Sequence, residues 1–274
     1  MTDHTHVDAT VGIIGDTHAD TKWTLAALNR VLSHGVKQVH VLGDFGFIWH
    51  GAPKEGRELI RLTTTLTDHG AHLYVTGGNH EGYAALDRDH PADTDGYRTI
   101  TDRITWLPRG WRGQTTAGTH VASLGGANSI DYERRRPPQG GHGGSWWPEE
   151  QLTDADLAAL GTAPVDVLLA HDAPRSQALH HQLAKTLHHW SKQGLAYSDA
   201  GQHMFQRAVE QVQPKLVLSG HYHLHLDTTE TFHTAHGDPF DTRSIILNCN
   251  GQPDSAGVLH VDRRDMKMVR VARV

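Results

Sequence analysis

Cysteine is nearly absent from this chain of 274 residues, which contains only Cys249. A single cysteine excludes an internal disulfide framework and any zinc site built from several thiolates. Cys249 ends an apolar, strand-like run, so we expect a buried structural thiol rather than a nucleophile. Long apolar runs are missing as well: no stretch of 18 apolar residues occurs, and no transmembrane helix is expected.

The first ten residues are polar and lack the apolar centre of a signal peptide, which predicts a cytoplasmic protein. An excess of basic residues is missing too, because 25 Lys and Arg face 31 Asp and Glu. Proteins that bind extended duplex nucleic acid are usually basic, so that function is disfavoured, although a local basic patch is compatible with these counts. Histidine, in contrast, occurs 24 times. No site needs so many, so position rather than number has to identify the functional histidines.

Short apolar runs alternate with helical patterns at the start of the chain. We expect strands over 11–14, 39–42 and 73–76. A helix capped by Asp20 or Thr21 follows the first strand, and a second helix over about 56–69 follows the second. Three strand-helix units predict a largely parallel sheet with crossover connections. The carboxyl ends of parallel strands lie at one edge of a sheet, so residues that follow these strands are expected to converge.

The rest of the chain mixes both types of structure. We expect β-hairpins over 97–124, helices over 153–160 and 176–213, and strands over 165–170, 215–219, 244–249, 257–261 and 266–274. The second of these helical segments is interrupted near Gly194. Residues 128–148 form a loop whose length is typical of a functional or variable segment. Since neither an internal repeat nor a linker is evident, we expect a single domain over residues 1–274 in which 176–213 acts as a helical lid.

Five of the predicted strands are each followed by aspartate, asparagine or histidine. In chain order these residues are Asp16 and His18, Asp44, Asn79 and His80, His171, and His221 and His223. Each alone could be a helix cap, a turn residue or a surface histidine, but together they follow one strand after another. Without cysteine they form an oxygen and nitrogen ligand set that suits Mn²⁺, Fe²⁺ or Zn²⁺. The set is too large for one ion, and two ions about 4 Å apart hold the attacking and leaving oxygens in phosphoryl displacement.

The ordered set resembles the motifs of the calcineurin-like metallophosphoesterase superfamily. Those motifs are D-x-H, GD, GNH[DE], H and GH-x-H, and all of them occur here in that order between residues 16 and 223. The resemblance implies an α/β fold, a four-layer α/β/β/α sandwich of two mixed β-sheets flanked by helices, with a dinuclear metal site at the C-terminal ends of strands. It also implies a metal-dependent phosphoesterase that hydrolyses a phosphate ester through a hydroxide bridging two divalent metal ions. Mn²⁺ is expected first, with Fe, Zn and Ni as alternatives.

The family pattern implies a role for each of these residues. One metal ion would be held by Asp16, His18 and His223, and the other by Asn79, His171 and His221, with Asp44 bridging both. The expected catalytic residues are Asp44 and His80, of which His80 would donate a proton to the leaving group. Of the other histidines, His180, His181, His188 and His189 are expected to be exposed or part of the lid. His225 could line the site.

The chain departs from the family's phosphoprotein phosphatases, which continue the second motif as GD-x-VDRG. Here Phe45 follows Asp44, and that later Asp and Arg are missing. Glu81 does match the GNHE variant, and we expect it to stabilise the N-terminus of a following helix. The residue that orients His80 is unassigned, with Asp20 and Asp172 as candidates.

The choice of substrate depends on weaker signals. The aromatic residues Phe45, Phe47 and Trp49 next to Asp44 could pack in the core, which is favoured, or stack on a base. Trp146 and Trp147 pose the same choice. The segment Arg134–Arg136 is expected to be a solvated face rather than a phosphate clamp.

Together with the missing phosphatase Arg, these features favour a phosphodiester or nucleotide substrate over a phosphoprotein. A short single-stranded nucleic acid is a further candidate. A phosphomonoesterase or phosphoprotein phosphatase, and an inactive metal-binding scaffold, are the alternatives. No membrane partner is expected.

Overall fold

The first strands and helices alternate as expected, in a computed structural model that describes residues 3–49, 53–135 and 144–272. Strands β1 (Thr10–Ile14), β2 (Gln38–Leu42) and β3 (His72–Thr76) pair in parallel in that order, and helices α1 (Thr21–Leu32) and α2 (Pro53–Asp68) connect them. As predicted, Asp20 caps α1, because its carboxylate accepts a hydrogen bond from the Trp23 backbone N–H.

The first sheet is completed by strands from later in the chain. Its order is β13-β12-β1-β2-β3-β5-β4, where β4 is Arg98–Thr101, β5 is Ile104–Trp106, β12 is Ala256–His260 and β13 is Asp265–Met268. The neighbours β12 and β1 pair antiparallel, whereas β5 runs parallel to β3. The sheet is therefore mixed.

The second sheet is mixed as well and has the order β10-β11-β9-β8-β7-β6. Its strands are β6 (Trp111–Gln114), β7 (His120–Leu124), β8 (Val167–Ala170), β9 (Leu216–Ser219), β10 (Leu226–His233) and β11 (Pro239–Ile246). The run β7-β8-β9-β11 is parallel, so β8 and β9 end at the same edge. The predicted hairpins over 97–124 form, but β4 and β5 belong to the first sheet and β6 and β7 to the second.

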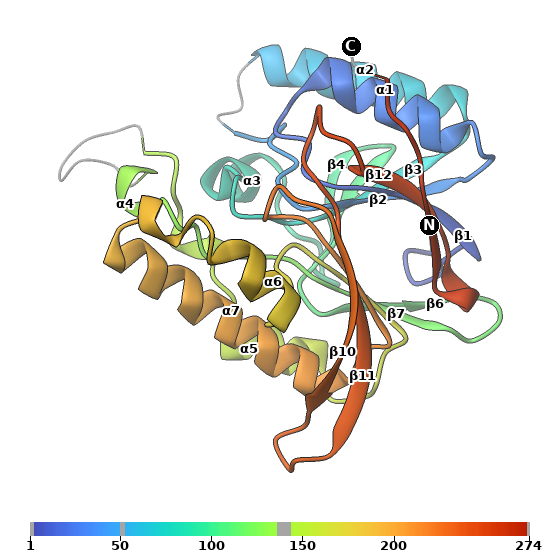
Figure 1. Ribbon diagram of the computed structural model, residues 1–274. Coiled ribbons are helices and arrows are strands. Elements are labelled where there is room, and N and C mark those ends of the chain that lie inside the picture. Colours follow the sequence, from blue (N-terminus) through green and yellow to red (C-terminus); the bar gives the residue numbers. More distant parts are fainter. Residues whose placement is uncertain (1–2, 50–52, 136–143, 273–274) are drawn as a thin grey trace.

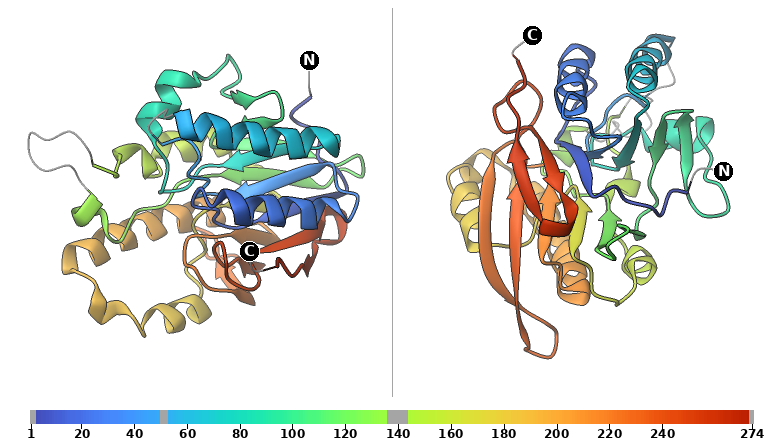
Figure 2. Two further views of the ribbon diagram at one scale, coloured as in Figure 1. Left: turned by 90° about the horizontal axis from the view of Figure 1, so that it is seen from above. Right: turned by 90° about the vertical axis from the view of Figure 1, so that its right-hand side faces the viewer.

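Helices cover the outer faces of both sheets (Figures 1 and 2). Helices α1 and α2 pack on the first sheet, and α5 (Asp154–Leu160) and α7 (Lys192–Val212) pack on the second. Between the sheets lies an apolar layer to which both contribute, for example Leu42 and Leu259 from the first and Leu169 and Leu218 from the second. The predicted four-layer α/β/β/α sandwich of two mixed sheets is confirmed.

The shorter helices complete the described chain. They are α3 (Tyr83–Asp89), α4 (Tyr132–Arg135), η1 (Pro148–Glu150), α6 (Gln177–Leu183), η2 (Leu187–His189) and η3 (Val261–Arg263). Within the described ranges, none of the helices combines the length and the apolar character needed to cross a bilayer.

Several predicted boundaries were wrong. The interruption of the segment 176–213 does not lie at Gly194, because Ser191 caps α7 by accepting the Gly194 backbone N–H, which places Gly194 in the first turn. The predicted strand 244–249 begins earlier and ends at Ile246. Its antiparallel neighbour β10 and the helix α3 were not predicted. The predicted strand at 266–274 ends at Met268, and its last two residues lie outside the described residues.

Candidate metal centre and active site

Residues that follow five strands meet where the two sheets face each other. Asp16, Asp44 and Asn79 follow β1, β2 and β3 of the first sheet, and His171 and His221 follow β8 and β9 of the second. Backbone hydrogen bonds connect neighbouring strand ends: the His18 N–H donates to the Asp44 carbonyl at 2.8 Å. The parallel strands of each sheet and the packing of the two sheets thus bring together residues 205 positions apart, such as Asp16 and His221.

Two buried carboxylates form the centre of this group. The side chain of Asp16 is fully buried, with its Oδ2 3.3 Å from Nε2 of His223 and its Oδ1 3.1 Å from the His221 backbone N–H. The side chain of Asp44 is buried as well, and its Oδ2 lies 3.3 Å from Nε2 of His18. One ligand atom from each of Asp16, His18, Asp44 and His223 lies within 4.8 Å of the others. Carboxylate and imidazole donors so placed fit one divalent cation.

A second group adjoins the first through Asp44. Its Oδ1 lies 3.2 Å from Nε2 of His171, and the same nitrogen lies 2.9 Å from Oδ1 of Asn79. The rings of His171 and His221 are 5.0 Å apart at their centroids. Asp44 therefore stands between the two groups, with one oxygen toward His18 and the other toward His171.

The backbone is strained where these side chains are presented. His18, Asp44, His221 and His223 all have positive φ, at 45°, 46°, 70° and 51°. Residues other than glycine rarely adopt this region, and such strain gathers at functional sites. His225 was considered as a residue that could line the site, but its Nδ1 bonds the Ile246 carbonyl at 3.0 Å instead.

Glycines permit the close approach of the strand ends. Gly43 has a φ of +90°, and a Cβ there would overlap the imidazole of His171. A Cβ at Gly220 would overlap the carboxylate of Asp16. Glycine at these two positions leaves room for the ligand-type side chains beside it.

The charges of the group are strongly coupled. Burial opposes a charged imidazolium at His171, but Asp44 and Asp16 outweigh it and raise its pKa to about 10. Burial likewise opposes a charge on His18, whose pKa is raised to about 9 by Asp44 and Asp16. Burial and the neighbouring His171 hold the pKa of His221 well below its usual value. Two buried carboxylates thus attract positive charge into this site, as a bound cation would require.

Two of the histidines have the hydrogen bonds typical of metal ligands. Nδ1 of His171 lies 2.7 Å from the Leu42 carbonyl, and Nδ1 of His18 lies 3.0 Å from Oδ1 of Asn250. In each case Nδ1 donates, so Nε2 faces the carboxylates and is the nitrogen that a metal ion would bind in place of its proton. Asn250 was not predicted, because no pattern in the sequence relates it to a residue 232 positions away.

His80 borders this group but faces a different neighbour. Its backbone N–H donates to Oδ1 of Asp44 at 2.7 Å, and its Nε2 lies 3.4 Å from Nη1 of Arg135. Neither suggested orienting residue contacts it: Asp20 caps α1, and Asp172 accepts from the Tyr222 hydroxyl. Burial, together with the charges of Arg135 and His18, lowers the pKa of His80.

Arg135 was expected on a solvated face, and that expectation is wrong. Its side chain is buried, donating from Nη2 to the Asn79 carbonyl at 2.8 Å and from Nη1 to Oγ of Ser129 at 2.5 Å. Its neighbour Arg134 is exposed, and Arg136 lies outside the described residues. The short helix α4 directs the Arg135 side chain into the protein. The sequence, which shows only three consecutive arginines, does not indicate which of them is buried.

A buried polar network continues from Arg135 and fixes Asn79. The Asn79 amide nitrogen donates to Oγ of Ser129 at 2.9 Å, and that hydroxyl donates to Glu150 at 2.7 Å. The amide oxygen of Asn79 is thereby directed toward His171. Ser129, Arg135 and Glu150 all belong to or border the predicted loop 128–148, and none was predicted as a site residue.

Glu81 does not stabilise a helix N-terminus, contrary to expectation. The N-cap of α3 is Gly82, which has no side chain to cap the helix. The buried carboxylate of Glu81 instead accepts the backbone N–H groups of Phe45 at 2.8 Å, Gly46 at 3.1 Å and Gly78 at 3.2 Å. Burial and the nearby Asp44 raise its pKa to about 7. Glu81 therefore connects the loop after β2 to the loop after β3.

The aromatic residues pack within the protein. Phe45 and Phe47 are fully buried in the core beneath α1 and α2, so the favoured packing interpretation is confirmed and the base-stacking one is wrong for both. Trp49 contacts Trp147 edge to face at 5.2 Å between centroids. Trp146 donates from Nε1 to Glu150 at 3.0 Å.

Cys249 lies close to the site but is only half-buried, so the expectation of a buried thiol was wrong in degree. Burial and the charge of Asp16 raise its pKa, which disfavours the reactive thiolate. The interpretation of Cys249 as a nucleophile gains no support.

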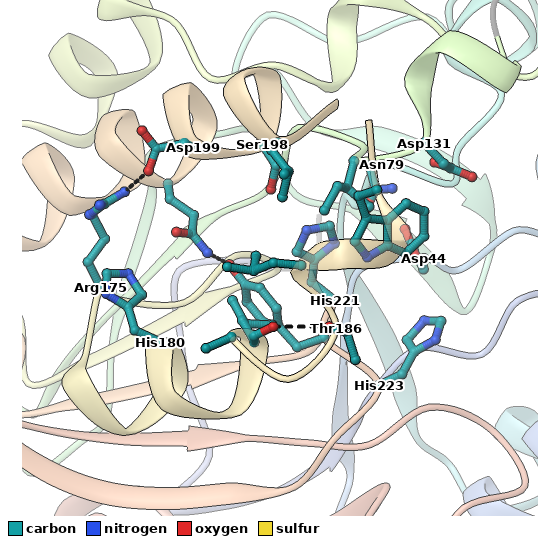
Figure 3. A pocket seen from close by; sticks show the side chains of 18 of the residues that line it. Asp44, Asn79, Asp131, Arg175, His180, Thr186, Ser198, Asp199, His221 and His223 are labelled. Carbon is teal, nitrogen blue, oxygen red and sulfur yellow. Dashed lines mark hydrogen bonds and ion pairs between the residues drawn. The ribbon is translucent and has the colours of Figure 1, made fainter. Parts of the chain in front are cut away.

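A cavity of about 860 Å³ opens from the strand ends (Figure 3). Asp44, Asn79, His80, His221 and His223 line one end of it. Its other walls come mainly from α6, η2 and α7, which form the segment 176–213. His180 lines the cavity, whereas His188 and His189 are exposed.

Comparison with known proteins agrees with this geometry. The family model of calcineurin-like phosphoesterases matches residues 9–225, which is more than half of the chain. The chain belongs to this family. It is accordingly a metal-dependent phosphoesterase, and the resemblance based on the strand-end motifs is confirmed.

Solved structures of similar fold include the protein TT1561 of Thermus thermophilus, with a TM-score of 0.53, 13% identity, and coverage of 96% of this chain and 99% of that one. A dimetal phosphatase from Danio rerio has a TM-score of 0.48 and 13% identity, with 91% of each chain covered. At such low identity the first likeness shows the fold alone. Among curated proteins, no significant sequence match was found.

Proposed function

We propose that this calcineurin-like phosphoesterase hydrolyses a phosphate ester with two divalent metal ions. The observation that carries the proposal is the position of Asp44, whose Oδ2 lies 3.3 Å from His18 and whose Oδ1 lies 3.2 Å from His171. A carboxylate placed between two sets of ligand-type side chains suits a bridge between two ions.

Two ligand sets follow from this bridge. Asp16, His18 and His223 with Asp44 would hold one ion, and Asn79, His171 and His221 with Asp44 the other. The donors are oxygen and nitrogen atoms, which favours Mn²⁺, with Fe, Zn and Ni as alternatives. When bound, two such ions would neutralise phosphate charge and activate a water molecule for attack on phosphorus.

The chain itself would supply the proton for the leaving group. The phosphate anion of the substrate would favour the charged form of His80, which burial and Arg135 disfavour in the free protein. As the bond from phosphorus to the water oxygen forms, the bond to the ester oxygen breaks, and His80 donates a proton to the departing alkoxide. Asp44 positions His80 by accepting its backbone N–H. Arg135 stabilises that position through the carbonyl of Asn79 and its proximity to the ring.

We further propose that the substrate is a phosphodiester, or a compound of nucleotide size. The cavity of about 860 Å³ next to the strand ends supports a large organic group. Arg135 donates hydrogen bonds to Ser129, Asn79 and Ser145. These N–H groups are therefore already used within the protein rather than for binding phosphate. A diester carries a single negative charge and needs fewer additional cations than a dianionic monoester. Short single-stranded nucleic acid is a further candidate substrate.

We also propose that residues 1–274 form a single domain and that the protein is cytoplasmic. A single domain is expected to unfold in one calorimetric transition whose van't Hoff and calorimetric enthalpies agree. Two separated transitions would contradict it. Cell fractionation tests the location.

The function is tested with bis-p-nitrophenyl phosphate and p-nitrophenyl phosphate in the presence of Mn²⁺, Fe²⁺, Zn²⁺ or Ni²⁺. The diester is expected to be cleaved faster than the monoester. Asp44→Ala is expected to lose bound metal and activity, whereas Asp102→Ala, on an exposed turn, serves as the control. If neither ester is cleaved and Asp44→Ala keeps its metal content, the proposal is wrong. Cyclic nucleotides, dinucleotides, single-stranded oligonucleotides and phosphopeptides then compare the substrate classes.

The role of His80 is tested separately from metal binding. His80→Ala is expected to keep both ions but lose most turnover, with a larger loss for phenyl esters than for p-nitrophenyl esters, because phenolate is the poorer leaving group. Asn79→Ala is expected to weaken the binding of one of the two ions. An inactive scaffold would bind metal and show no turnover in the unmodified protein.

A further inference from the structure

The cavity beside the strand ends differs in chemistry along its length. At one end are the side chains that the proposed function assigns to metal binding and proton donation. Its lining also includes Ile130, Leu183, Leu187, Trp190 and Leu195, whose side chains are largely apolar. These come from the segment after β7 and from α6, η2 and α7, so separate elements contribute to one apolar surface.

Two polar side chains of the cavity wall, Gln202 and Tyr222, are hydrogen-bonded within the protein. The Gln202 amide nitrogen donates to the Tyr222 hydroxyl at 2.6 Å, and this hydroxyl donates to Asp172 at 2.5 Å. These bonds occupy the Gln202 amide nitrogen and the Tyr222 hydroxyl, which lies next to His221 and His223 in the chain. A ligand gains little there from donors or acceptors of its own, and more from apolar contact.

The far end of the cavity carries a neutralised cation. Arg175 donates from Nη1 to Oδ1 of Asp199 at 2.5 Å, and His180 lies in the same region (Figure 3). In that view these three side chains lie away from Asn79, Asp44 and His223. Because the aspartate offsets the guanidinium charge, this end suits a neutral group better than a second phosphate.

We propose that the cavity beneath α6, η2 and α7 binds an apolar organic group of the substrate, so that the enzyme prefers phosphate esters of apolar alcohols over nucleotides. This inference rests on the proposed phosphoesterase function and specifies its substrate class. The phosphate lies at the strand ends, and the apolar group extends along Leu195 and Trp190 toward Leu187. The length of this apolar group, rather than hydrogen bonding, determines the affinity of the enzyme for the substrate.

The test uses alkylphosphonates with one, four or eight carbons, titrated calorimetrically into Mn²⁺-loaded protein. All three have the same anionic phosphonate group, so differences in affinity depend on the length of the alkyl group alone. Burial of each methylene strengthens binding by about fourfold, and at least a fiftyfold gain is expected from one carbon to eight. Adenosine 5′-monophosphate, which has a polar body, is expected to bind more weakly than octylphosphonate.

Two substitutions test whether the gain in affinity with alkyl length comes from the cavity. The double variant Leu187→Ser/Leu195→Asn is expected to reduce the ratio of octyl to methyl affinity at least fivefold. Leu187 is 45% exposed, so its replacement does not empty the core. The matched control is Ile60→Ser on α2, an apolar residue that is 65% exposed and lies outside the cavity, and it is expected to leave the ratio unchanged.

The apolar preference and the phosphoesterase function can fail independently, and the two measurements distinguish these cases. Hydrolysis of bis-p-nitrophenyl phosphate is measured in the same preparation. If hydrolysis occurs but affinity is independent of chain length, or the nucleotide binds more tightly than octylphosphonate, the apolar preference is refuted and the phosphoesterase function stands. If affinity rises with chain length without any hydrolysis, the proposed function fails and the apolar site remains.

Discussion

The guanidinium of Arg135 lies against the imidazole of His80, with Nη1 3.4 Å from Nε2. The same guanidinium donates to the carbonyl of Asn79, the residue before His80. Arg135 thus contacts both the backbone that carries His80 and the ring itself. A residue 55 positions along the chain therefore controls where the proposed proton donor stands.

Arg135→Met is expected to lower turnover by about 10- to 100-fold, because a buried charged hydrogen-bond donor is worth about 1.5–3 kcal/mol. If Arg135 acts by positioning His80, the same substitution in the His80→Ala protein should cost less than about twofold, since the effects are not additive. Arg135→Lys should recover part of the activity. Steady-state kinetics on the unmodified protein and the four variants check this, and equal losses in both backgrounds would contradict the positioning role.

Ser129→Ala is expected to weaken metal binding about 10- to 100-fold at one of two sites, as is usual when a partner of a ligand is lost. The hydroxyl accepts the Asn79 amide and donates to Glu150, which fixes the direction of the amide. Without it the amide can turn its nitrogen toward His171. Calorimetric titration with Mn²⁺ measures the change, with Ser33→Ala on the exposed end of α1 as the control. Equal weakening of both sites would show a general loss of structure instead.

The strand ends were predictable because they depend on local pattern and one rule of topology. Apolar runs before Asp16, Asp44, Asn79, His171 and His221 predict strands. Parallel pairing brings the first three strand ends to one edge of the first sheet and the last two to one edge of the second. The second sheet, in contrast, was known only through the family resemblance.

The residues that support the site were not predictable in the same way. Arg135, Ser129 and Glu150 act through contacts that depend on how the segment after β7 folds back over the strand ends. The sequence around Arg135 resembles any short basic run, so burial could not be inferred. The packing of Phe45 and Phe47 was ambiguous for the same reason, because an aromatic side chain suits a core and a ligand wall equally well.

His40→Phe is expected to make the protein more resistant to mild acid. His40 is buried on β2 and stacks on Tyr74 at 5.2 Å, and within the described residues neither ring nitrogen has a hydrogen-bond partner. Burial lowers its pKa from 6.5 to about 3. The folded state therefore keeps His40 neutral while the unfolded state takes up a proton below pH 6.5, so stability falls as the pH drops from 6.5 toward 3.

This effect of His40 amounts to about 2 kcal/mol at pH 5, and it vanishes above pH 7 because both states are then neutral. Phenylalanine keeps the stacking and cannot be protonated. Urea unfolding at pH 7.5 and pH 5, with a chelator present, measures the difference between the two proteins. A stability gap that is the same at both pH values would show that His40 does not titrate between the states.

Glu81→Gln is expected to loosen the two loops that present Asp44 and Asn79. The carboxylate accepts three backbone N–H groups at 2.8–3.2 Å, whereas an amide has one acceptor oxygen and turns an N–H₂ group toward another donor. The free energy of unfolding should fall by about 2–3 kcal/mol. Because Phe45 follows Asp44 and Gly78 precedes Asn79, Mn²⁺ affinity should fall as well. Calorimetry and urea unfolding measure both, with the exposed Glu149→Gln as the control. A loss of stability without any loss of metal affinity would limit Glu81 to a role in folding, since the ligands would then hold their positions without it.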